Sequence, residues 1–373
     1  MRLVVGAAIV RDGSLLAARR TTPVEAAGRW ELPGGKVEPG ESPEEGLVRE
    51  IAEELGCGVT VERWLDGEQP IGGTHLLRAA LCRLTEGEPR PGDDHDAVRW
   101  LTPEQLADVD WLEPDRPFLS ELGEVLLDGV VLPGGNLGGA VRIGDTVRRP
   151  TGRWTPAVHA LLGHLRAKGL RAVPRVHGYD ARGREVLDFL PGEIVDVDTG
   201  LLGEARLADL GRWTRELHEA VADFEHPGPW RFWSPASWDC LLHNDLGPYN
   251  VAFDGDQVSG VFDWDVAGPG TVVFELGYLA WCAVPLFRPI PDAVAARRLR
   301  ILAAAYDGPS ATEILAAVPD RIAGMVANLR AGIEAGDPTL ERLAARGEPA
   351  NLERDCEALV ERMPGVLAAL EPS

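Results

Sequence analysis

The first third of the chain places short apolar runs between turn residues, a pattern typical of β-strands. Residues 3–10 and 14–20 predict two strands joined at Asp12-Gly13, which is a hairpin signal. The loop ELPGGKVEPGES follows, and residues 43–55 then predict a helix that ends at Gly56.

Further strands are predicted at 59–66, 75–85 and 97–101. The run TPEQLADV predicts a helix capped by Thr102, because Gln105 stands three residues later. This β-rich layout, with a helix after a glycine loop, predicts one α/β domain over residues 1–125.

The remainder has a different pattern. Residues 126–149 hold short apolar runs separated by glycine, and after Pro191-Gly192 the chain becomes mostly helical. The predicted elements are a helix at 155–168, strands at 172–179 and 184–190, and a short β section around 250–263. We therefore expect a linker at 126–132 and a second domain at 133–373, with a small lobe at 133–190 and a helical lobe at 191–373. No internal repeat links the two parts, which indicates a fusion rather than a duplication.

Composition narrows the function. A length of 373 residues with 45% hydrophobic residues suits two cores. The net charge of −22 argues against a nucleic-acid polymer as partner, because its phosphates would be repelled. The five cysteines form no close pair and indicate neither a disulfide framework nor a zinc site. No apolar run is long enough to cross a bilayer, so we expect a cytoplasmic protein without a membrane partner. The sequence does not indicate an oligomeric state.

The predicted helix 43–55 carries the first chemical motif. Glu50, Glu53 and Glu54 stand at i, i+3 and i+4, so their carboxylates share one face. Carboxylates this close repel one another unless a hard cation lies among them, and oxygen ligands suit Mg²⁺ or Mn²⁺. The preceding Gly34-Gly35 lets the backbone come close to metal and phosphates.

A second feature ties this helix to the loop before it. Arg49 can hold Glu41, which lies in the loop. The series from Gly35 through Glu41 to Arg49 and the three glutamates resembles the Nudix box at every fixed position; Cys57 replaces an aliphatic residue that is usual there. The alternative, an acidic helix facing solvent, leaves the glycine loop and the arginine unexplained.

The resemblance implies hydrolysis of a diphosphate bond by water with metal ions. It assigns metal binding to Glu50, Glu53 and Glu54, helped by the carbonyl of Gly35, and we expect Glu53 to handle the proton of the water. Two weaker candidates for a general base or extra ligand are His95 and Asp96; an exposed polar loop is an equal alternative for both.

The run LLAARRTTPVEAAGRWELPGGKVEPGE further resembles the MutT-type nucleoside triphosphate pyrophosphohydrolases. That resemblance implies that Arg20 contacts the triphosphate, that Lys36 can do the same, and that Asp115 bonds the nucleobase edge. Alternatively, Arg20 is an ordinary surface arginine, and Asp115 caps a helix before Arg116-Pro117.

The second motif is HNDLGPYN, which gives His243-x-Asp245 with Asn250 five residues after the aspartate. Phe262-Asp263-Trp264-Asp265 follows on a predicted strand. One Asp to accept the proton of a substrate hydroxyl, with an Asn and a second Asp to hold Mg²⁺, suits phosphoryl transfer from a nucleotide.

This segment resembles the aminoglycoside phosphotransferase and choline kinase family, which shares the protein-kinase fold. The resemblance makes Asp245 the catalytic base and Asn250 and Asp263 magnesium ligands. It gives Asp265 and His243 the tasks of organising the loop and orienting the catalytic turn. ATP would be the donor and a small hydroxylated molecule the acceptor. An Asp-rich turn in an unrelated α/β fold is the alternative reading.

Two departures affect the small lobe. No lysine stands at the place of the kinase phosphate-contacting residue, so one of Arg148 and Arg149 would have to take that role. The following helix offers no glutamate, and His159 is its nearest polar residue. PGGNLGG could cover phosphates, and residues 187–193 resemble the hinge where an adenine docks.

Several tryptophans cluster near the second motif, and we favour core packing over a substrate pocket for them; they are Trp230, Trp233, Trp238, Trp264 and Trp281.

The sequence therefore predicts an α/β (α+β) protein, a Nudix α/β/α sandwich followed by a two-lobed kinase-like domain with a helical C-terminal lobe. The leading hypothesis is hydrolysis of a nucleoside triphosphate to the monophosphate and pyrophosphate, joined to a small-molecule kinase. The alternatives are a different diphosphate substrate, such as a nucleotide sugar, and a second domain that binds nucleotide without transferring phosphate.

Overall fold

The computed structural model describes residues 1–132, 139–196, 200–232 and 238–371. The described residues of Met1–Pro133 with Gly139–Arg149 form one compact unit, and those of Pro150–Ser373 form the second. Across these ranges, no helix combines the length and apolarity needed to cross a membrane.

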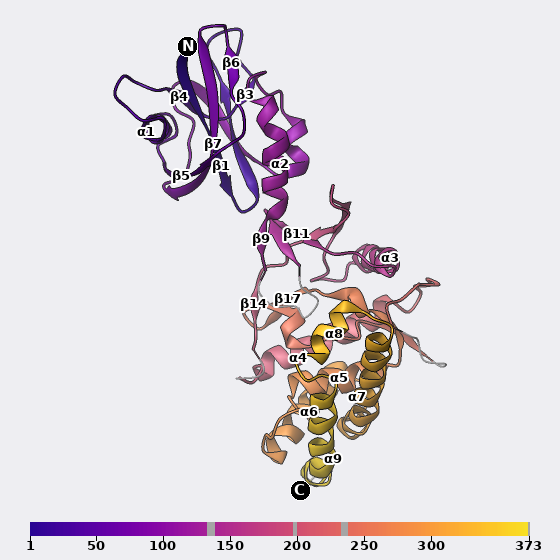
Figure 1. Cartoon of the computed structure of the whole chain (residues 1–373). Coiled ribbons are helices and arrows are strands. Elements are labelled where there is room, and N and C mark those ends of the chain that lie inside the picture. The colour runs from indigo at the N-terminus through magenta and orange to yellow at the C-terminus, as the bar shows by residue number, and fades with distance from the viewer. Residues whose placement is uncertain (133–138, 197–199, 233–237, 372–373) are drawn as a thin grey trace. The chain divides into compact units, whose positions relative to one another are not determined.

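The first unit is built on a mixed sheet (Figure 1). Its main path runs β3-β2-β1-β7-β5, with β4 beside β1, β6 beside β7 and β8 beside β2. β1 and β7 are parallel, so the sheet centre joins strands far apart in sequence. The strands are β1 (Arg2–Arg11), β2 (Ser14–Arg20), β3 (Trp30–Glu31), β4 (Gly34–Lys36), β5 (Gly58–Trp64), β6 (Gln69–Ile71), β7 (His75–Glu86) and β8 (His95–Leu101).

Helices cover both faces of this sheet (Figure 1). α1 (Pro43–Leu55) buries Leu47 and Ile51 against Val5, whereas α2 (Leu119–Asp128) buries Leu122 against Ala8 on the opposite face. β1 is almost continuously apolar because neither face meets water. The predicted α/β/α sandwich is confirmed.

The helix ends follow their local sequence. Ser42 accepts from the backbone N–H of Glu45, whose side chain accepts in return from Ser42, and Gly56 closes α1 in the left-handed conformation. The predicted helix after Thr102 is a 3-10 helix, η1 (Pro103–Asp108), in which the Gln105 side chain bonds back to the Thr102 N–H.

α2 received no prediction, although Leu119, Leu122 and Leu126 have helical spacing. It extends through Asp128, so the expected domain end at residue 125 and the first part of the expected linker lie inside a helix. The 3-10 turn η2 (Arg116–Phe118) leads into it.

Three short antiparallel strands complete the first unit: β9 (Val130–Val131), β10 (Val141–Ile143) and β11 (Thr146–Arg149). The β10–β11 turn reaches the first hairpin, where Gly144 N–H donates to the Asp12 carbonyl at 2.5 Å. A side chain on Gly13, at φ +70°, would come within 3.0 Å of the Ile143 Cα. The hairpin therefore needs glycine both for its turn and for this close approach.

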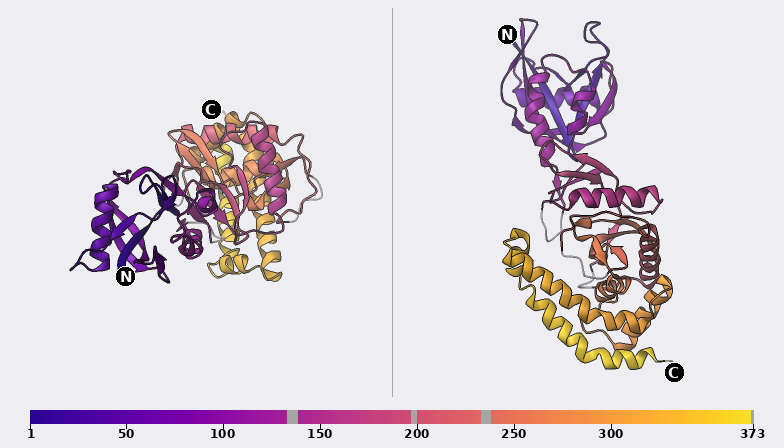
Figure 2. Two further views of the ribbon diagram at one scale, coloured as in Figure 1. Left: turned by 90° about the horizontal axis from the view of Figure 1, so that it is seen from above. Right: turned by 90° about the vertical axis from the view of Figure 1, so that its right-hand side faces the viewer.

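The second unit combines small sheets with a helical body (Figure 2). β12 (Val176–Tyr179) pairs with β13 (Glu185–Asp188), and β15 (Cys240–Leu242) pairs with β18 (Gly268–Gly270). A three-stranded sheet has the order β14 (Glu193–Ile194), β16 (Val251–Asp254) and β17 (Gln257–Val261). The α-helices are α3 (Thr155–Ala167), α4 (Glu204–Ala220), α5 (Val272–Ala283), α6 (Asp292–Tyr306), α7 (Ala311–Glu334), α8 (Pro338–Ala344) and α9 (Ala350–Leu370). Two 3-10 turns are η3 (Pro248–Asn250) and η4 (Trp264–Val266).

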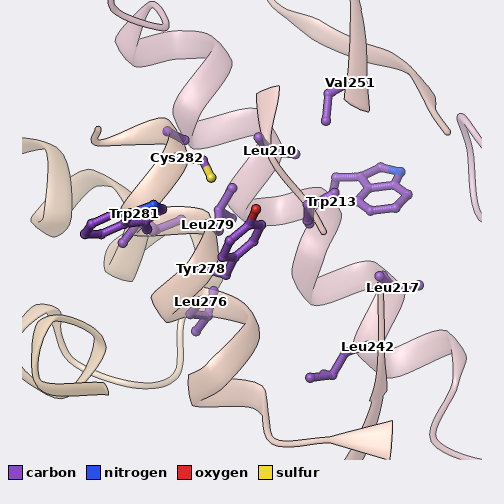
Figure 3. Close-up of a cluster of buried hydrophobic side chains, with 14 of the residues drawn as sticks. Leu210, Trp213, Leu217, Leu242, Val251, Leu276, Tyr278, Leu279, Trp281 and Cys282 are labelled. Atoms are coloured by element: carbon purple, nitrogen blue, oxygen red, sulfur yellow. The ribbon is translucent and has the colours of Figure 1, made fainter. Parts of the chain in front are cut away.

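The core of the second unit centres on α5, which is apolar on nearly every side and almost wholly buried. Leu276, Leu279 and Trp281 of this helix belong to one buried cluster with Leu210 and Trp213 of α4 (Figure 3). α4 packs on α6 and α5 on α7, while α9 lies along α7. The predicted helical C-terminal region is confirmed, and its β section supplies the site described next.

Candidate active sites

The first site lies where α1 meets the glycine loop. Gly34 N–H donates to Glu54 Oε2 at 3.2 Å. A Cβ built on Gly35 would lie 2.3 Å from the Glu50 carboxylate, so only glycine lets this carboxylate approach the backbone. Glu53 is more open, with 61% of its side chain exposed. Glu53 and Glu54 also line an open hollow of about 480 Å³ together with Glu88 and Arg90.

Arg49 fixes the loop to the helix. It donates to both carboxylate oxygens of Glu41, at 2.8 and 3.1 Å, and to the Lys36 carbonyl at 3.1 Å. The same guanidinium reaches Glu50 at 3.0 Å and Glu53 at 3.2 Å. The pairing of Arg49 with Glu41 is the one that the sequence predicts.

The carboxylates of the first site outnumber the cationic side chains near them. Burial, with repulsion from Glu31 and Glu50, raises the pKa of Glu54 to about 7, although His95 and the Gly34 N–H act in the opposite direction. In the part of the chain that the structure describes, no three His, Cys, Asp or Glu side chains already converge into a metal cluster. The donors are all oxygens, which fits Mg²⁺ or Mn²⁺ and not a soft metal.

Behind the glutamates lies a buried group centred on Glu31, which the sequence analysis missed. Glu31 Oε1 accepts from Arg20 Nη1 at 2.7 Å and lies 2.9 Å from His95 Nε2. Arg20 also donates to the Thr22 carbonyl, so its guanidinium is engaged within the protein. In the sequence, only the position of Glu31, directly after Trp30 and before the glycine loop, could have indicated that it lies at this site.

His95 and Asp96, which are neighbours in the sequence, differ in exposure in the structure. His95 is buried at the start of β8 and is 4% exposed, so the exposed-loop reading is wrong for it. Asp96 is half exposed and forms a bidentate pair with Arg19 at 2.7 and 3.0 Å.

Asp115 is 3% exposed and accepts from the Leu32 N–H at 3.4 Å. It is the N-cap residue of η2 but makes no side-chain cap bond, so the cap alternative holds for its position alone. Burial, with repulsion from Glu31, raises its pKa well above its usual range. Lys36 is exposed at the end of β4.

The second site is formed by Asp245 and its donors. Oδ1 of Asp245 accepts from the hydroxyls of Tyr249, at 2.6 Å, and Tyr278, at 2.9 Å. Oδ2 accepts from Asn250 Nδ2 at 3.0 Å. Burial and repulsion from Asp263 raise the pKa of Asp245 to about 6, against the lowering effect of these three donors.

The β16–β17 hairpin brings the motif together. Phe262 N–H donates to the Asn250 carbonyl at 3.1 Å, which places Asp263 next to Asn250 along the paired backbone. Asp263 adopts φ +63°, a left-handed conformation. His243 is fully buried and bonds the Phe262 carbonyl through Nε2 at 3.0 Å, which fits an orienting role.

Asp265 is buried and lies 3.5 Å from Arg231, which also reaches Asp337 at 3.3 Å. The Arg231 guanidinium stacks over the Trp154 ring at 4.5 Å. Asp265 therefore belongs to a contact between its loop and the start of α3.

Distant helices support the catalytic turn. Glu275 of α5 is fully buried and accepts from the Asn244 N–H, and Arg321 of α7 donates to the Asn244 carbonyl at 2.6 Å. Asn244 itself adopts φ +66°. Burial raises the pKa of Glu275 to about 7. The sequence analysis missed Glu275, Arg321 and Tyr278, because no local motif marks them.

The small-lobe candidates have other partners. Arg148 is 1% exposed and donates to Glu104 at 2.8 Å, so the structure does not leave it free to contact phosphates. His159 pairs with Glu185 of β13 at 2.9 Å. Of the predicted phosphate cover PGGNLGG, residues 133–138 lie outside the described ranges.

Core packing is confirmed for Trp230, Trp264 and Trp281, which are buried. Trp238 is 54% exposed, and Trp233 lies outside the described ranges.

Two known family models match this chain. The NUDIX domain model matches residues 1–122, and the Phosphotransferase enzyme family model matches residues 230–314. Both resemblances seen in the sequence are thereby confirmed.

Three relatives show the range of similar proteins. A Mycobacterium tuberculosis protein with the provisional name 8-oxo-dGTP diphosphatase 2 is 45% identical over 128 residues, 34% of this chain and 90% of that protein. CTP pyrophosphohydrolase of Escherichia coli is 35% identical over 31% of this chain and 87% of that protein. The trifolitoxin immunity protein of Rhizobium leguminosarum is 35% identical over 43% of this chain and 64% of that protein.

Proposed function

Because the chain belongs to the Nudix hydrolase family, with a region of the phosphotransferase enzyme family behind that domain, we propose that its first unit cleaves a nucleoside triphosphate to the monophosphate and pyrophosphate. The second unit, in this proposal, transfers a phosphoryl group from ATP to a small hydroxylated molecule. The domain division is proposed to follow the two matches.

The observation that carries the first activity is the convergence of Glu50 and Glu54 on the Gly34–Gly35 backbone, with Glu53 beside them at an open hollow. Glu50, Glu53, Glu54 and the Gly35 carbonyl are the proposed ligands of Mg²⁺ or Mn²⁺. The metal supplies charge neutralisation for the phosphates and lowers the pKa of bound water. Glu53, the most exposed of the three, takes the proton from the attacking water.

Substrate contacts follow from exposure and charge. Lys36 is exposed beside the loop and is assigned to the phosphates. Arg20 orders Glu31 and contacts the triphosphate only with its remaining N–H groups. Asp115, whose raised pKa favours the protonated acid, can donate a hydrogen bond to a base edge as well as accept one.

A substrate panel tests this activity. Full-length protein with Mg²⁺ is offered 8-oxo-dGTP, CTP, the common dNTPs and NTPs, and nucleotide sugars. The names of the relatives make 8-oxo-dGTP and CTP the first substrates to test. Pyrophosphate and a monophosphate are the expected products. Exclusive cleavage of nucleotide sugars would instead support the alternative diphosphate substrate.

For the second unit, Asp245 is proposed as the base, and Asn250 and Asp263 as the residues that would hold Mg²⁺, which would neutralise the charge of the nucleotide phosphates. His243 and Asp265 hold the two loops, and residues 187–193 are the proposed adenine hinge. The intact Asp245, Asn250 and Asp263 group carries this proposal.

One observation favours a second candidate, nucleotide binding without transfer. Arg148, one of the two arginines expected to contact the phosphates, is instead engaged by Glu104. Formation of ADP from ATP by the wild type and by Asp245→Asn separates the two, because the first activity would give AMP and pyrophosphate instead. A kinase loses its turnover in the variant, whereas a non-catalytic domain binds ATP and shows no turnover to lose.

A further inference from the structure

The hydrogen bonds around Asp245 suggest how an acceptor would enter the second site, if the proposed phosphoryl transfer holds. Oδ1 already accepts from two hydroxyls, those of Tyr249 and Tyr278. A carboxylate oxygen offers two lone-pair sites, so a third hydroxyl at Oδ1 must replace one of these donors. Oδ2 accepts from Asn250, on the side of the proposed metal ligands.

The two tyrosines differ in how firmly they are held. Tyr278 lies on α5 within the hydrophobic core, beside Leu276 and Leu279, and is 6% exposed (Figure 3). The guanidinium of Arg321 stacks over its ring at 4.7 Å while it binds the Asn244 carbonyl. Tyr278 is therefore held by its place on a buried helix and by the guanidinium over its ring.

Tyr249 is held much less. It belongs to the short η3 turn, and 41% of its surface is exposed. Its ring lies against the backbone of Gly247, where a Cβ would come within 2.4 Å of the Tyr249 Cε1 atom. Its hydroxyl proton is donated to Asp245, and its oxygen lies 2.7 Å from the hydroxyl oxygen of Tyr278.

We propose that the Tyr249 hydroxyl occupies the place of the acceptor hydroxyl at Asp245 Oδ1 and is displaced by it, while Tyr278 stays as the residue that positions the base. Tyr249 then selects for acceptors able to replace it, namely neutral or cationic alcohols, because Asp245 and Asp263 repel an anion.

The transfer step balances with this geometry. The acceptor hydroxyl gives its proton to Asp245 Oδ1, and its oxygen forms a bond to the γ-phosphorus of ATP. The bond from that phosphorus to the β,γ-bridging oxygen breaks, and ADP leaves. Tyr249 takes no part in bond making, so its removal does not abolish transfer.

The test uses full-length protein with MgATP and compares wild type, Tyr249→Phe, Tyr278→Phe and Asp245→Asn. Turnover by the second unit is followed as formation of ADP, because cleavage of ATP by the first unit would give AMP and pyrophosphate. Water is the first acceptor, followed by ethanol, glycerol and ethanolamine as probe alcohols. Tyr249→Phe should raise ATP hydrolysis by about threefold or more and lower the KM for the probe alcohols, because a competing hydroxyl is gone. Tyr278→Phe should lower kcat about tenfold with little change in the KM for ATP, because the base loses its orientation.

The opposite signs of two identical Tyr→Phe changes separate this proposal from a structural role, which would move both variants in one direction. Equal or parallel effects, or a slower Tyr249→Phe enzyme, would overturn it while leaving phosphoryl transfer intact. Absence of ATP turnover in all four proteins overturns the transfer function and this inference together. Thermal unfolding of each variant checks the fold, and Tyr249→Leu is a second variant that removes ring and hydroxyl.

Discussion

The two candidate sites balance their carboxylates by different means. In the first unit, the carboxylates form ion pairs with guanidinium groups. Arg49 binds Glu41, Glu50 and Glu53, and Arg20 binds Glu31. In the second unit, Asp245 accepts hydrogen bonds from two phenols and a carboxamide, which carry no net charge. A cation stabilises a carboxylate over a wide range of distances, whereas a neutral donor acts only through a well-placed hydrogen bond.

This difference predicts different sensitivities. The first site should tolerate small shifts of geometry but depend on its charges, and the second should depend on hydroxyl and amide positions. It also extends to the core of the second unit, where the buried His218 has a neutral partner, the hydroxyl of Tyr306 at 2.9 Å.

The largest expected effect is removal of one charge at the first site. Glu53→Gln keeps size and hydrogen bonding but removes the proposed acceptor of the water's proton. We expect turnover of the nucleoside triphosphate to fall by about two orders of magnitude or more. Steady-state kinetics with pyrophosphate detection measures this, and ATP turnover by the second unit is the internal control. Wild-type rates in this variant would contradict the role given to Glu53.

The next effect concerns the neutral surroundings of His218. Burial lowers the pKa of His218 to about 4 from its ordinary value of 6.5. The unfolded chain binds a proton near pH 6.5 while the folded ring stays neutral, so the stability of the second unit is full above pH 6.5 and falls as the pH drops toward 4. This one group should cost about 2 kcal/mol between pH 7 and pH 5.

Urea unfolding of wild type and His218→Gln at both pH values measures this cost. The variant can be less stable overall, but the difference between the two pH values should shrink by about 2 kcal/mol. An unchanged pH dependence would show that His218 has the same pKa in the folded and the unfolded chain.

A smaller effect is expected from a change that keeps charge and alters shape. Arg49→Lys preserves one positive charge but cannot hold both oxygens of Glu41 while reaching Glu50. We expect kcat/KM of the first activity to fall about tenfold, with ATP turnover unchanged. A loss as large as that of Glu53→Gln would mean that geometry matters as much as charge at this site.

The part of each site that could be predicted lies close together in sequence. Glu50, Glu53 and Glu54 share one helical turn, and Asp245 and Asn250 share one turn before a hairpin, so spacing alone relates them. Tyr278 stands 33 positions after Asp245, and Arg321 stands 77 positions after Asn244. Tertiary packing creates these contacts, and no periodicity encodes them.

The same reasoning explains the misassigned residues. Arg148 looked available because its partner Glu104 lies 44 positions earlier, and His95 looked exposed because its neighbours in sequence are polar. Both are buried by segments that a local pattern does not include. The sandwich and the helical C-terminal region were predictable because repeated apolar spacing records burial directly.

The pair formed by Arg148 and Glu104 has a consequence for where the chain can be divided into separate units. The guanidinium is buried, and its carboxylate partner comes from the segment just before α2. Cutting the gene between residues 125 and 132 would leave a cation without its counter-charge, at a cost of up to about 3 kcal/mol, less whatever solvent then reaches it. A division after Arg149 keeps both members of the pair in the first unit, so the two units are better separated there than near residue 125.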